Sequence, residues 1–267
     1  MESNQSNMEQ SQSENLILYK YLSIDGAKMM LSYSNLQFTN ATKFNDPFDC
    51  HPSLIDFSNV PTERCKGWTP DIIELLESDR YRRNREDAWV CCLSKAFDSL
   101  LMWGYYNNHK GVCIGLNMKK VSKYLNASIG FMVDNLAHEV QYRDIIEKPD
   151  YFRDQEDFFH YQMCTKAKVW EHEHEMRLFI FEPFPWIMSL LPGQNDNDGP
   201  IDWKEVKAFP KIGGECFEVI YLGVNINKGE KDKLIKVAKN LNPAIKVYQM
   251  GVNTEAFKLD AIYLDNI

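Results

Sequence analysis

The chain has 267 residues, of which 44% are hydrophobic and 13% aromatic, and this is enough apolar material for a substantial core. Its net charge of -8 argues against a broad electrostatic attraction to nucleic acid or to an anionic membrane, and no apolar run is long enough to span a bilayer. Its seven cysteines form no CxxC pair and no zinc-like spacing. They indicate reduced thiols, which predicts a cytoplasmic protein.

The N-terminal part of the chain begins with a polar segment, 1–15, that lacks an apolar stretch. We expect it to be a disordered tail rather than a signal peptide or an anchor. A strand, a helix that Ser23 or Asp25 caps, a second short strand and a long charged helix are then predicted. Their ranges are 16–22, 23–34, 36–42 and 70–89.

The middle of the chain alternates between apolar runs and helical spacing of apolar residues. We predict a buried strand, a helix, a strand, a helical or irregular segment, a strand, and a helix rich in aromatic residues. Their ranges are 88–94, 95–111, 111–117, 118–137, 138–144 and 150–166.

The last third opens with a strand over 176–181, followed by a segment rich in proline and glycine, 183–215, which predicts a loop insertion. A strand, helix, strand unit over 218–252 and a terminal strand over 256–264 complete the chain. The predicted fold class is α+β, with a mixed, mainly antiparallel sheet and flanking helices. Residues 16–267 are expected to form a single domain.

The stretch KAKVWEHEHEMRLFIF places two carboxylates, Glu173 and Glu175, just before an apolar run. If the strand extends back over them, alternation of side chains puts both on one face together with Arg177. The pair is then either an arranged acidic site or a solvated strand edge that pairs with Arg177 and Lys168.

The two histidines of the same stretch, His172 and His174, alternate with the glutamates. Imidazole and carboxylate groups suit zinc or iron, but two histidines supply only two ligands. Because no HExxH motif or cysteine cluster completes them, no metal site is predicted.

Two other polar features have a structural and a functional interpretation. The FNDPFD segment has the composition of a tight turn, or else its Asn45 and Asp46 line a cleft. Ser94, after the predicted strand 88–94, is either a helix cap or a site residue, because no GxSxG motif supports a hydrolase. P-loop and Rossmann glycine patterns are absent from the sequence.

Four segments in this order resemble the bacterial family called "domain of unknown function 2971". They are YKY, FNDPFD, the CLS strand end with MWGYYNNHKGVCIGL after it, and the pattern W-x-x-E-x-E-x-R. The resemblance extends from Tyr19 to the IKVYQM segment and so covers nearly the whole chain. It implies no particular reaction.

More weakly, the chain resembles the ADP-ribosyltransferase fold in three places: a basic residue on an early strand, a serine on a strand that enters a helix, and Glu-x-Glu at a late strand. Here these positions are Lys20, Ser94, and Glu173 with Glu175. The chain departs from the pattern at the first position, because those enzymes usually have arginine or histidine where this one has Lys20 beside Tyr21.

This second resemblance implies an NAD-dependent ADP-ribosyltransferase that uses NAD as its substrate and modifies a macromolecule, either protein or nucleic acid. It further implies a toxin or phage-defence effector accompanied by an antitoxin or immunity partner. Glu175 would stabilise the positive charge that develops on the ribose, and Glu173 would orient or deprotonate the acceptor. Ser94 would hold the carboxylate or the ribose.

The resemblance also implies which residues contact NAD, with the last two of the following stacking on nicotinamide: Lys20, Tyr21, Asn45, Asp46, Trp103 and Tyr106. The alternative is a noncatalytic binding or regulatory domain in which the glutamates and tryptophans build structure. The residues leave the acceptor and the oligomeric state open.

Overall fold

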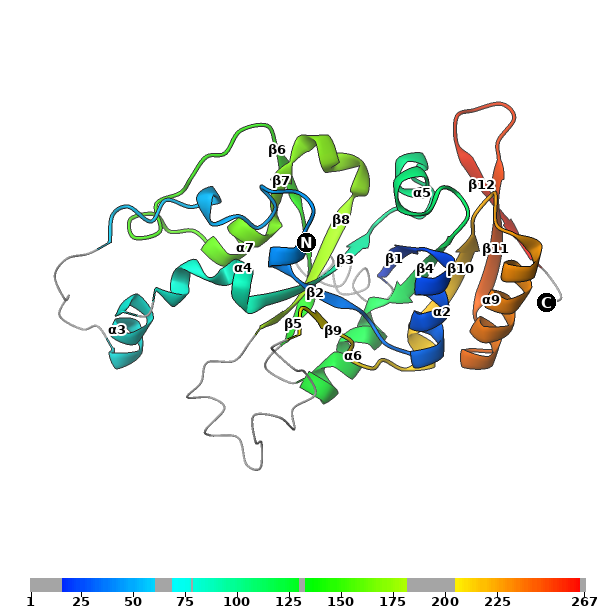
Figure 1. Ribbon diagram of the computed structural model, residues 1–267, viewed down its shortest axis with the longest axis horizontal. Coiled ribbons are helices and arrows are strands. Elements are labelled where there is room, and N and C mark those ends of the chain that lie inside the picture. The colour runs from blue at the N-terminus through cyan, green and yellow to red at the C-terminus, as the bar shows by residue number, and fades with distance from the viewer. Residues whose placement is uncertain (1–15, 61–68, 78, 130–132, 182–204, 265–267) are drawn as a thin grey trace, which may run out of the picture.

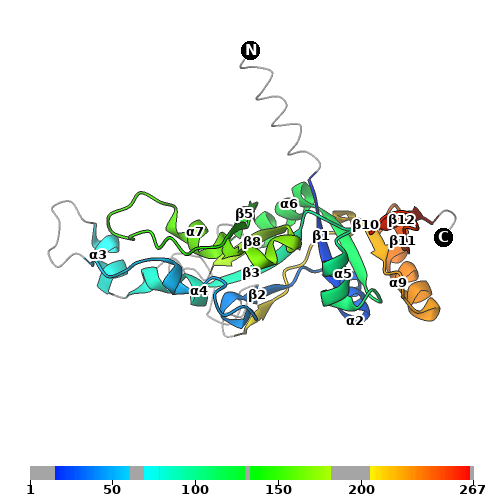
Figure 2. The same cartoon turned by 90° about the horizontal axis from the view of Figure 1, so that it is seen from above.

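The computed structural model describes most of the chain, in the ranges 16–60, 69–77, 79–129, 133–181 and 205–264. The predicted tail, 1–15, and most of the predicted insertion, 182–204, lie outside the described residues. Figures 1 and 2 show an elongated molecule in which helices α3 and α9 lie at opposite ends, with the sheet between them.

The sheet has ten strands in the order β12-β11-β10-β4-β1-β3-β2-β9, and β8 lies between β3 and β5. Their bounds are β1 Ile17–Leu22, β2 Phe38–Asn40, β3 Ala88–Ser94, β4 Val112–Asn117, β5 Val133–Glu139, β8 Glu175–Phe181, β9 Lys207–Ala208, β10 Phe217–Leu222, β11 Lys246–Val252 and β12 Leu259–Tyr263. Strands β10 and β11 pair in parallel, and the other described pairs of this sheet are antiparallel. The predicted α+β class with a mixed, mainly antiparallel sheet is confirmed.

The remaining described elements are seven α-helices, five short 3-10 helices and a parallel pair of strands. Their bounds are α2 Ile24–Tyr33, α3 Pro70–Glu77, α4 Asn84–Asp87, α5 Leu100–Asn107, α6 Met118–Ile129, α7 Phe158–Cys164, α9 Lys228–Leu241, η1 Ala41–Lys43, η2 Pro52–Leu54, η3 Arg80–Arg82, η5 Lys168–Glu173, η6 Gly214–Cys216, β6 Gln141–Arg143 and β7 Thr165–Ala167.

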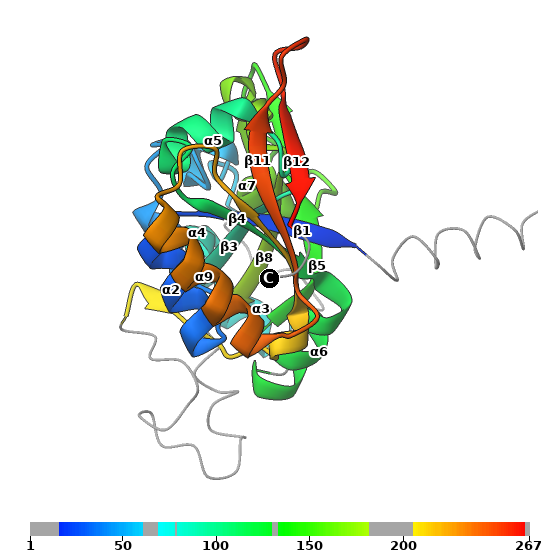
Figure 3. The ribbon, with the colours of Figure 1, turned by 90° about the vertical axis from the view of Figure 1, so that its right-hand side faces the viewer.

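Helices cover both faces of the sheet. Helices α2, α6 and α9 pack against one face, where Leu18, Ile114 and Ile220 belong to the main core, and Figure 3 shows α2 and α9 side by side. On the opposite face, α5 packs through Trp103, and α7 packs against the part of the sheet that contains Phe179. Side chains therefore alternate between two buried layers along the central strands.

Local sequence signals account for several of these elements. Ser23 caps α2 by accepting a hydrogen bond from the backbone N–H of Gly26, as expected. Helix α2 ends at Ser34, whose φ of 49° is left-handed. The strand predicted over 88–94 has the bounds of β3, and the strand, helix, strand unit near the C-terminus is confirmed as β10, α9 and β11.

Two predicted helices are wrong in extent. The helix predicted over 70–89 is interrupted near Asp79, whose φ of 52° is left-handed. The helix predicted over 150–166 is reduced to α7, because Asp150 accepts a hydrogen bond from the N–H of Phe152 and makes a turn instead. Helix α7 begins only after Asp157, whose carboxylate caps it.

Three other predicted boundaries also differ. The segment 118–137, predicted as helical or irregular, contains α6 and then most of β5. The segment predicted as a loop insertion over 183–215 includes β9, which pairs with β2. The terminal strand begins at Leu259 rather than at 256, because Asn253 accepts backbone hydrogen bonds from Glu255 and Ala256 and closes the hairpin loop.

The sheet forks between β1 and β3. Strand β8 pairs along one edge of β3 from Ala88 to Ser94. On the other edge, β2 pairs at the start of β3 and β1 pairs only where Tyr19 lies opposite Ser94. Among the described strands, 91–93 has no ladder partner on that edge, so β1 and β3 separate there.

Candidate functional site

The three strands that carry the predicted acidic and polar residues are neighbours. Tyr19 of β1 lies opposite Ser94 of β3, and Ser94 lies opposite Glu175 of β8. The expectation that these strands share one sheet is confirmed. They meet at the fork, where a cavity of about 50 Å³ is lined by Lys20, Ser94 and both glutamates.

Glu175 is the first residue of β8 and is 4% exposed. Its Oε1 accepts a hydrogen bond from Arg177 Nε at 2.8 Å, and its Oε2 accepts one from Arg177 Nη2 at 3.0 Å. Lys166 Nζ lies 2.9 Å from the same Oε2. The prediction that Glu175 and Arg177 share a face is confirmed, and the solvated strand edge is wrong.

Glu173 belongs to the same cluster, but it lies on a different element from the predicted strand. It ends the 3-10 helix η5 rather than lying on β8, and His174 then reverses the chain with a left-handed φ of 45°. Glu173 is nevertheless 4% exposed. Its Oε1 accepts a hydrogen bond from the Tyr106 hydroxyl at 3.1 Å, and its Oε2 contacts Lys166 Nζ.

A buried ion network extends from the two glutamates toward the FNDPFD segment. Asp49 accepts two hydrogen bonds of 2.8 Å from the guanidinium of Arg177, which is 0% exposed. Lys166 Nζ lies 3.7 Å from Asp49 and 5.2 Å from the ring centre of Trp170. Lys166 therefore contacts both glutamates, whereas Arg177 contacts Glu175 and Asp49.

Lys168, the lysine expected to pair with the glutamates, instead lies 3.6 Å from Asp144 on the surface. Asp49, Lys166 and Arg177 each contact Glu175 or a group that does. The predicted pair is thus embedded in a five-residue network of three carboxylates and two cations.

The two glutamates differ in electrostatic environment. Burial raises the pKa of Glu173, and neighbouring Glu175 adds to this, while Lys166 and Tyr106 oppose it only in part. Burial alone would also raise the pKa of Glu175, but Arg177 and Lys166 outweigh it and hold that pKa well below its ordinary value. Glu175 therefore keeps its negative charge. Of the two carboxyl groups, Glu173 has the higher pKa and takes up a proton first as the pH falls.

The other predicted residues at the fork hold backbone groups. Ser94 Oγ donates to the carbonyl of Glu173 at 2.7 Å and accepts from the N–H of Ala96 at 3.1 Å. Lys20 Nζ crosses the fork and donates to the carbonyl of Cys92 at 2.7 Å. Ser94 thus positions the segment that carries Glu173 and makes no bond to the Glu175 carboxylate.

Tyr21 and Tyr106 also line this cavity. The hydroxyl of Tyr21 donates to the carbonyl of Ala96 at 3.0 Å. Tyr106 is half-exposed, although its hydroxyl reaches Glu173. The structure therefore brings together six of the predicted site residues: Lys20, Tyr21, Ser94, Tyr106, Glu173 and Glu175.

Three predicted NAD contacts are not at the cavity. Trp103 is fully buried, donates from its indole to the carbonyl of Phe97 at 2.8 Å, and packs against Tyr21. Asn45 is exposed, and Asp46 accepts from the N–H of Phe48 in a tight turn. Trp103 therefore stabilises the packing of α5, and Asp46 stabilises a turn.

Sequence reasoning missed Asp49, Lys166 and Cys92 as site residues. Asp49 belongs to the FNDPFD segment, in which only Asn45 and Asp46 are predicted from the sequence to line a cleft. Cys92 lines the cavity and lies two residues before Ser94. Lys166 stands seven residues before Glu173, and only tertiary folding shows that the two side chains meet.

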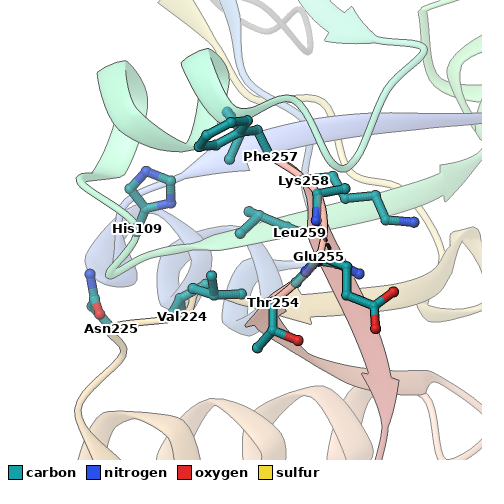
Figure 4. Close-up of a pocket in the computed structure, with 12 residues that line it drawn as sticks. His109, Val224, Asn225, Thr254, Glu255, Phe257, Lys258 and Leu259 are labelled. Atoms are coloured by element: carbon teal, nitrogen blue, oxygen red, sulfur yellow. Dashed lines mark hydrogen bonds between the residues drawn. The ribbon is translucent and has the colours of Figure 1, made fainter.

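A larger pocket lies elsewhere. It measures about 480 Å³ and is formed between the two ends of α5 and the hairpin that joins β11 to β12. Figure 4 shows His109, Val224 and Leu259 around it, with Phe257 on the hairpin. None of the predicted site residues lines this mostly apolar pocket. The larger pocket is therefore not the site that contains the predicted acidic residues.

Within the described ranges, no group of three histidine, cysteine or acidic side chains is placed to hold a metal ion. None of the described helices has the length and apolar character that crossing a bilayer requires. Comparison of the chain with family models, curated proteins and solved structures gave no match.

Proposed function

We propose that the protein is an NAD-dependent ADP-ribosyltransferase with its active site at the fork between β1 and β3. The observation that supports this most is the convergence of Lys20, Ser94, Glu173 and Glu175 on one cavity, although they come from four separate elements. An ionised carboxylate beside a second carboxyl group of raised pKa suits a reaction that needs both a fixed charge and a base.

The proposed reaction begins at the bond between nicotinamide and ribose. As this bond breaks, its electron pair goes to the nicotinamide ring, and positive charge develops on the ribose. Glu175 is held ionised by Arg177 and Lys166, so it stabilises a charge that is present mainly in the transition state. A bond from the acceptor to the same ribose carbon then completes the transfer.

Glu173 is proposed as the base that takes the acceptor's proton. Its raised pKa brings it closer to neutral pH, where a general base exchanges protons most effectively. The Tyr106 hydroxyl, at 3.1 Å, fixes one carboxyl oxygen in place. The acceptor is a macromolecule in the cytoplasm, and we extend the proposal to a toxin or phage-defence role with a neutralising partner protein.

Binding of NAD requires the fork to open. A cavity of about 50 Å³ is far below the roughly 300 Å³ or more that small-molecule sites occupy. The hydrogen bond from the Lys20 ammonium to the carbonyl of Cys92 spans the gap between the strands, and because its donor is charged, releasing it costs about 1.5–3 kcal/mol net. The closed fork is then the resting state, and the freed Lys20 ammonium is available to the NAD phosphates.

A split sheet of this kind, with an early basic residue, a serine and a Glu-x-Glu pair in that chain order, supports the finer assignment to an ADP-ribosyltransferase-like fold.

The proposal is tested by measuring nicotinamide release from NAD by the purified protein. Glu175→Gln is expected to lower the rate a hundredfold or more, corresponding to about 3 kcal/mol of transition-state stabilisation. The matched control is Glu171→Gln, because Glu171 is exposed on the same 3-10 helix. Equal rates in the wild type and Glu175→Gln contradict the proposal.

A noncatalytic domain is the second candidate, and the closed geometry favours it. Both carboxylate oxygens of Glu173, Glu175 and Asp49 already have partners, as in a structural ion network. Calorimetry with NAD at millimolar concentration separates the two. The absence of both binding heat and a rise in melting temperature supports the structural network. If NAD binds, nicotinamide release that Glu175→Gln abolishes supports the enzyme, and binding without release supports a noncatalytic binding domain.

A further inference from the structure

Lys166 occupies a central place in the ion network. It lies on β7, and its side chain is 8% exposed. Its ammonium contacts Glu173 Oε2, lies 2.9 Å from Glu175 Oε2, and is 3.7 Å from Asp49. An ammonium has three donor hydrogens, so one group links the two glutamates directly. The Trp170 ring, 5.2 Å away, faces the same ammonium.

The two cations of the network divide the carboxylates unequally. Arg177 donates two hydrogen bonds to Glu175 and two to Asp49. Glu173 receives none from it, and among the described residues the cation that contacts Glu173 is Lys166. Glu173 is thus the carboxylate with the weakest cationic support.

Charge balance predicts where a proton resides. Three carboxylates are paired with two cations, and the third cation at the cavity, Lys20, donates to the carbonyl of Cys92 rather than to a carboxylate. The fully ionised network therefore leaves one negative charge without a direct cationic partner, and a buried unpaired charge is costly. Protonation of the least supported carboxylate, Glu173, removes that excess. The direction of its pKa, raised by burial and by Glu175, agrees with this.

The other titratable groups that face the network do not alter the balance, because burial keeps them neutral. Burial raises the pKa of the Cys50 and Cys92 thiols and that of the Tyr106 hydroxyl, and it raises the pKa of Tyr142 to about 12. Cys50 follows the FNDPFD segment, and the other three groups lie on β3, α5 and β6. Strand β1 contributes the charged Lys20, whose ammonium donates to the carbonyl of Cys92.

We propose that Lys166 is a positioning residue: its ammonium holds Glu173 and Glu175 side by side at the fork and leaves Glu173 as the carboxyl group that exchanges a proton. Its part in catalysis rests on the proposed ADP-ribosyl transfer. The charge arrangement itself does not, so it is measured without NAD.

The test is carbon NMR of protein labelled at the glutamate carboxyl carbons, titrated with acid and base. Glu173→Gln and Glu175→Gln assign the two signals. In Lys166→Met the loss of the positive charge is expected to raise the titration midpoint of Glu173 by at least about one pH unit, a tenfold change in proton affinity. Lys166→Arg keeps the charge and is expected to stay near the wild type. A Glu173 midpoint in Lys166→Met within about 0.3 pH units of the wild type overturns the proposal.

Folding is checked with the double variant Lys166→Met/Glu173→Gln, which removes one positive and one negative charge. If Lys166→Met unfolds, the double variant is expected to regain a dispersed proton NMR spectrum, because the lysine's main counterpart is then also gone. If the double variant also unfolds, Lys166 serves Asp49 and Glu175 structurally, and the proposal is wrong.

Activity supplies the last comparison. If NAD is a substrate, the pH profile of labelled ADP-ribose transfer to cell extract, the step assigned to Glu173, moves to higher pH in Lys166→Met and not in Lys166→Arg. An active enzyme whose profile does not move contradicts the role of Lys166. A protein that never releases nicotinamide contradicts the proposed function and leaves the NMR result to decide the charge arrangement.

Discussion

Asp49 and Arg177 are 128 residues apart in the chain, yet they face each other through two parallel hydrogen bonds of 2.8 Å in the buried interior. This bidentate geometry, with two parallel N–H to carboxylate hydrogen bonds, is among the strongest ion pairs between side chains. It connects the turn after β2 to strand β8, and it leaves the Nε and Nη2 edge of the Arg177 guanidinium for Glu175. The position of the Glu175 carboxylate therefore depends on a residue outside its own element.

Breaking this pair from one side is expected to be costly. Asp49→Asn leaves the Arg177 guanidinium, which is 0% exposed, short of a counter-charge, and the loss of one member of a buried pair typically costs about 3–5 kcal/mol. Urea unfolding followed by circular dichroism measures it. The control is Glu147→Gln, which removes a surface pair with Arg143 and is expected to change stability by less than about 0.5 kcal/mol. Equal effects of the two variants would show that the buried pair is not stabilising.

Stability is expected to fall in acid, and Glu175 is the main reason. Its folded pKa lies well below the ordinary 4.5, so its contribution is complete above that value and is lost as the pH falls below it. Glu173 acts in the opposite sense, because its raised pKa stabilises the fold at low pH and this contribution disappears as the pH rises through the folded value.

Thermal unfolding between about pH 3 and 8 measures this dependence, with a slope of up to about 1.4 kcal/mol per pH unit for one proton. Glu175→Gln should flatten the acid limb relative to the wild type. The control, Glu171→Gln, should retain it. An acid limb in Glu175→Gln as steep as in the wild type would assign the acid sensitivity to other carboxylates.

Two of the strands at the fork, β3 and β8, follow from patterns that are visible in the sequence. The run AWVCCLS is apolar and compact enough to specify a buried strand, and β3 has those bounds. The alternation from Glu175 through Arg177 also fixes which side chains of β8 share a face. Both features depend on local periodicity, which a single sequence contains.

The rest of the site depends on contacts that local periodicity does not encode. Glu173 joins the cluster because His174 adopts a left-handed conformation. A glycine at this position would have indicated such a turn, but a histidine does not. Lys166 and Asp49 reach the glutamates from other elements. The helix predicted over 150–166 is wrong in extent because the Asp150 side chain accepts a hydrogen bond from the backbone N–H of Phe152, which favours a turn over a helix.

Tyr106 is predicted to tune Glu173. Its hydroxyl hydrogen bond to Glu173 Oε1 favours the ionised carboxylate, so Tyr106→Phe is expected to raise the Glu173 pKa further. The measurement is the pH profile of ADP-ribose transfer to cell extract, in which the limb that requires ionised Glu173 should move to higher pH. Tyr105→Phe is the matched control, because Tyr105 is the exposed neighbour on the same helix. A profile that moves equally in both variants would contradict the specific role of Tyr106.

The two glutamates are predicted to separate two activities. Glu173 is proposed to take a proton from the acceptor, and Glu175 to stabilise the ribose charge that both transfer and hydrolysis require. Glu173→Gln is therefore expected to lower transfer of labelled ADP-ribose to cell extract by tenfold or more, about 1.4 kcal/mol, while nicotinamide release in buffer falls less. Glu175→Gln is expected to lower both activities together.

Stability must be matched in this comparison, because Glu173 contacts both Lys166 and Tyr106 and the substitution weakens a buried pair. Each variant is therefore assayed well below its own melting temperature. If transfer and hydrolysis fall by the same factor in Glu173→Gln, Glu173 acts on the ribose or on the fold rather than on the acceptor. The division of labour proposed from the unequal cationic support of the two carboxylates would then be wrong, even if the protein cleaves NAD.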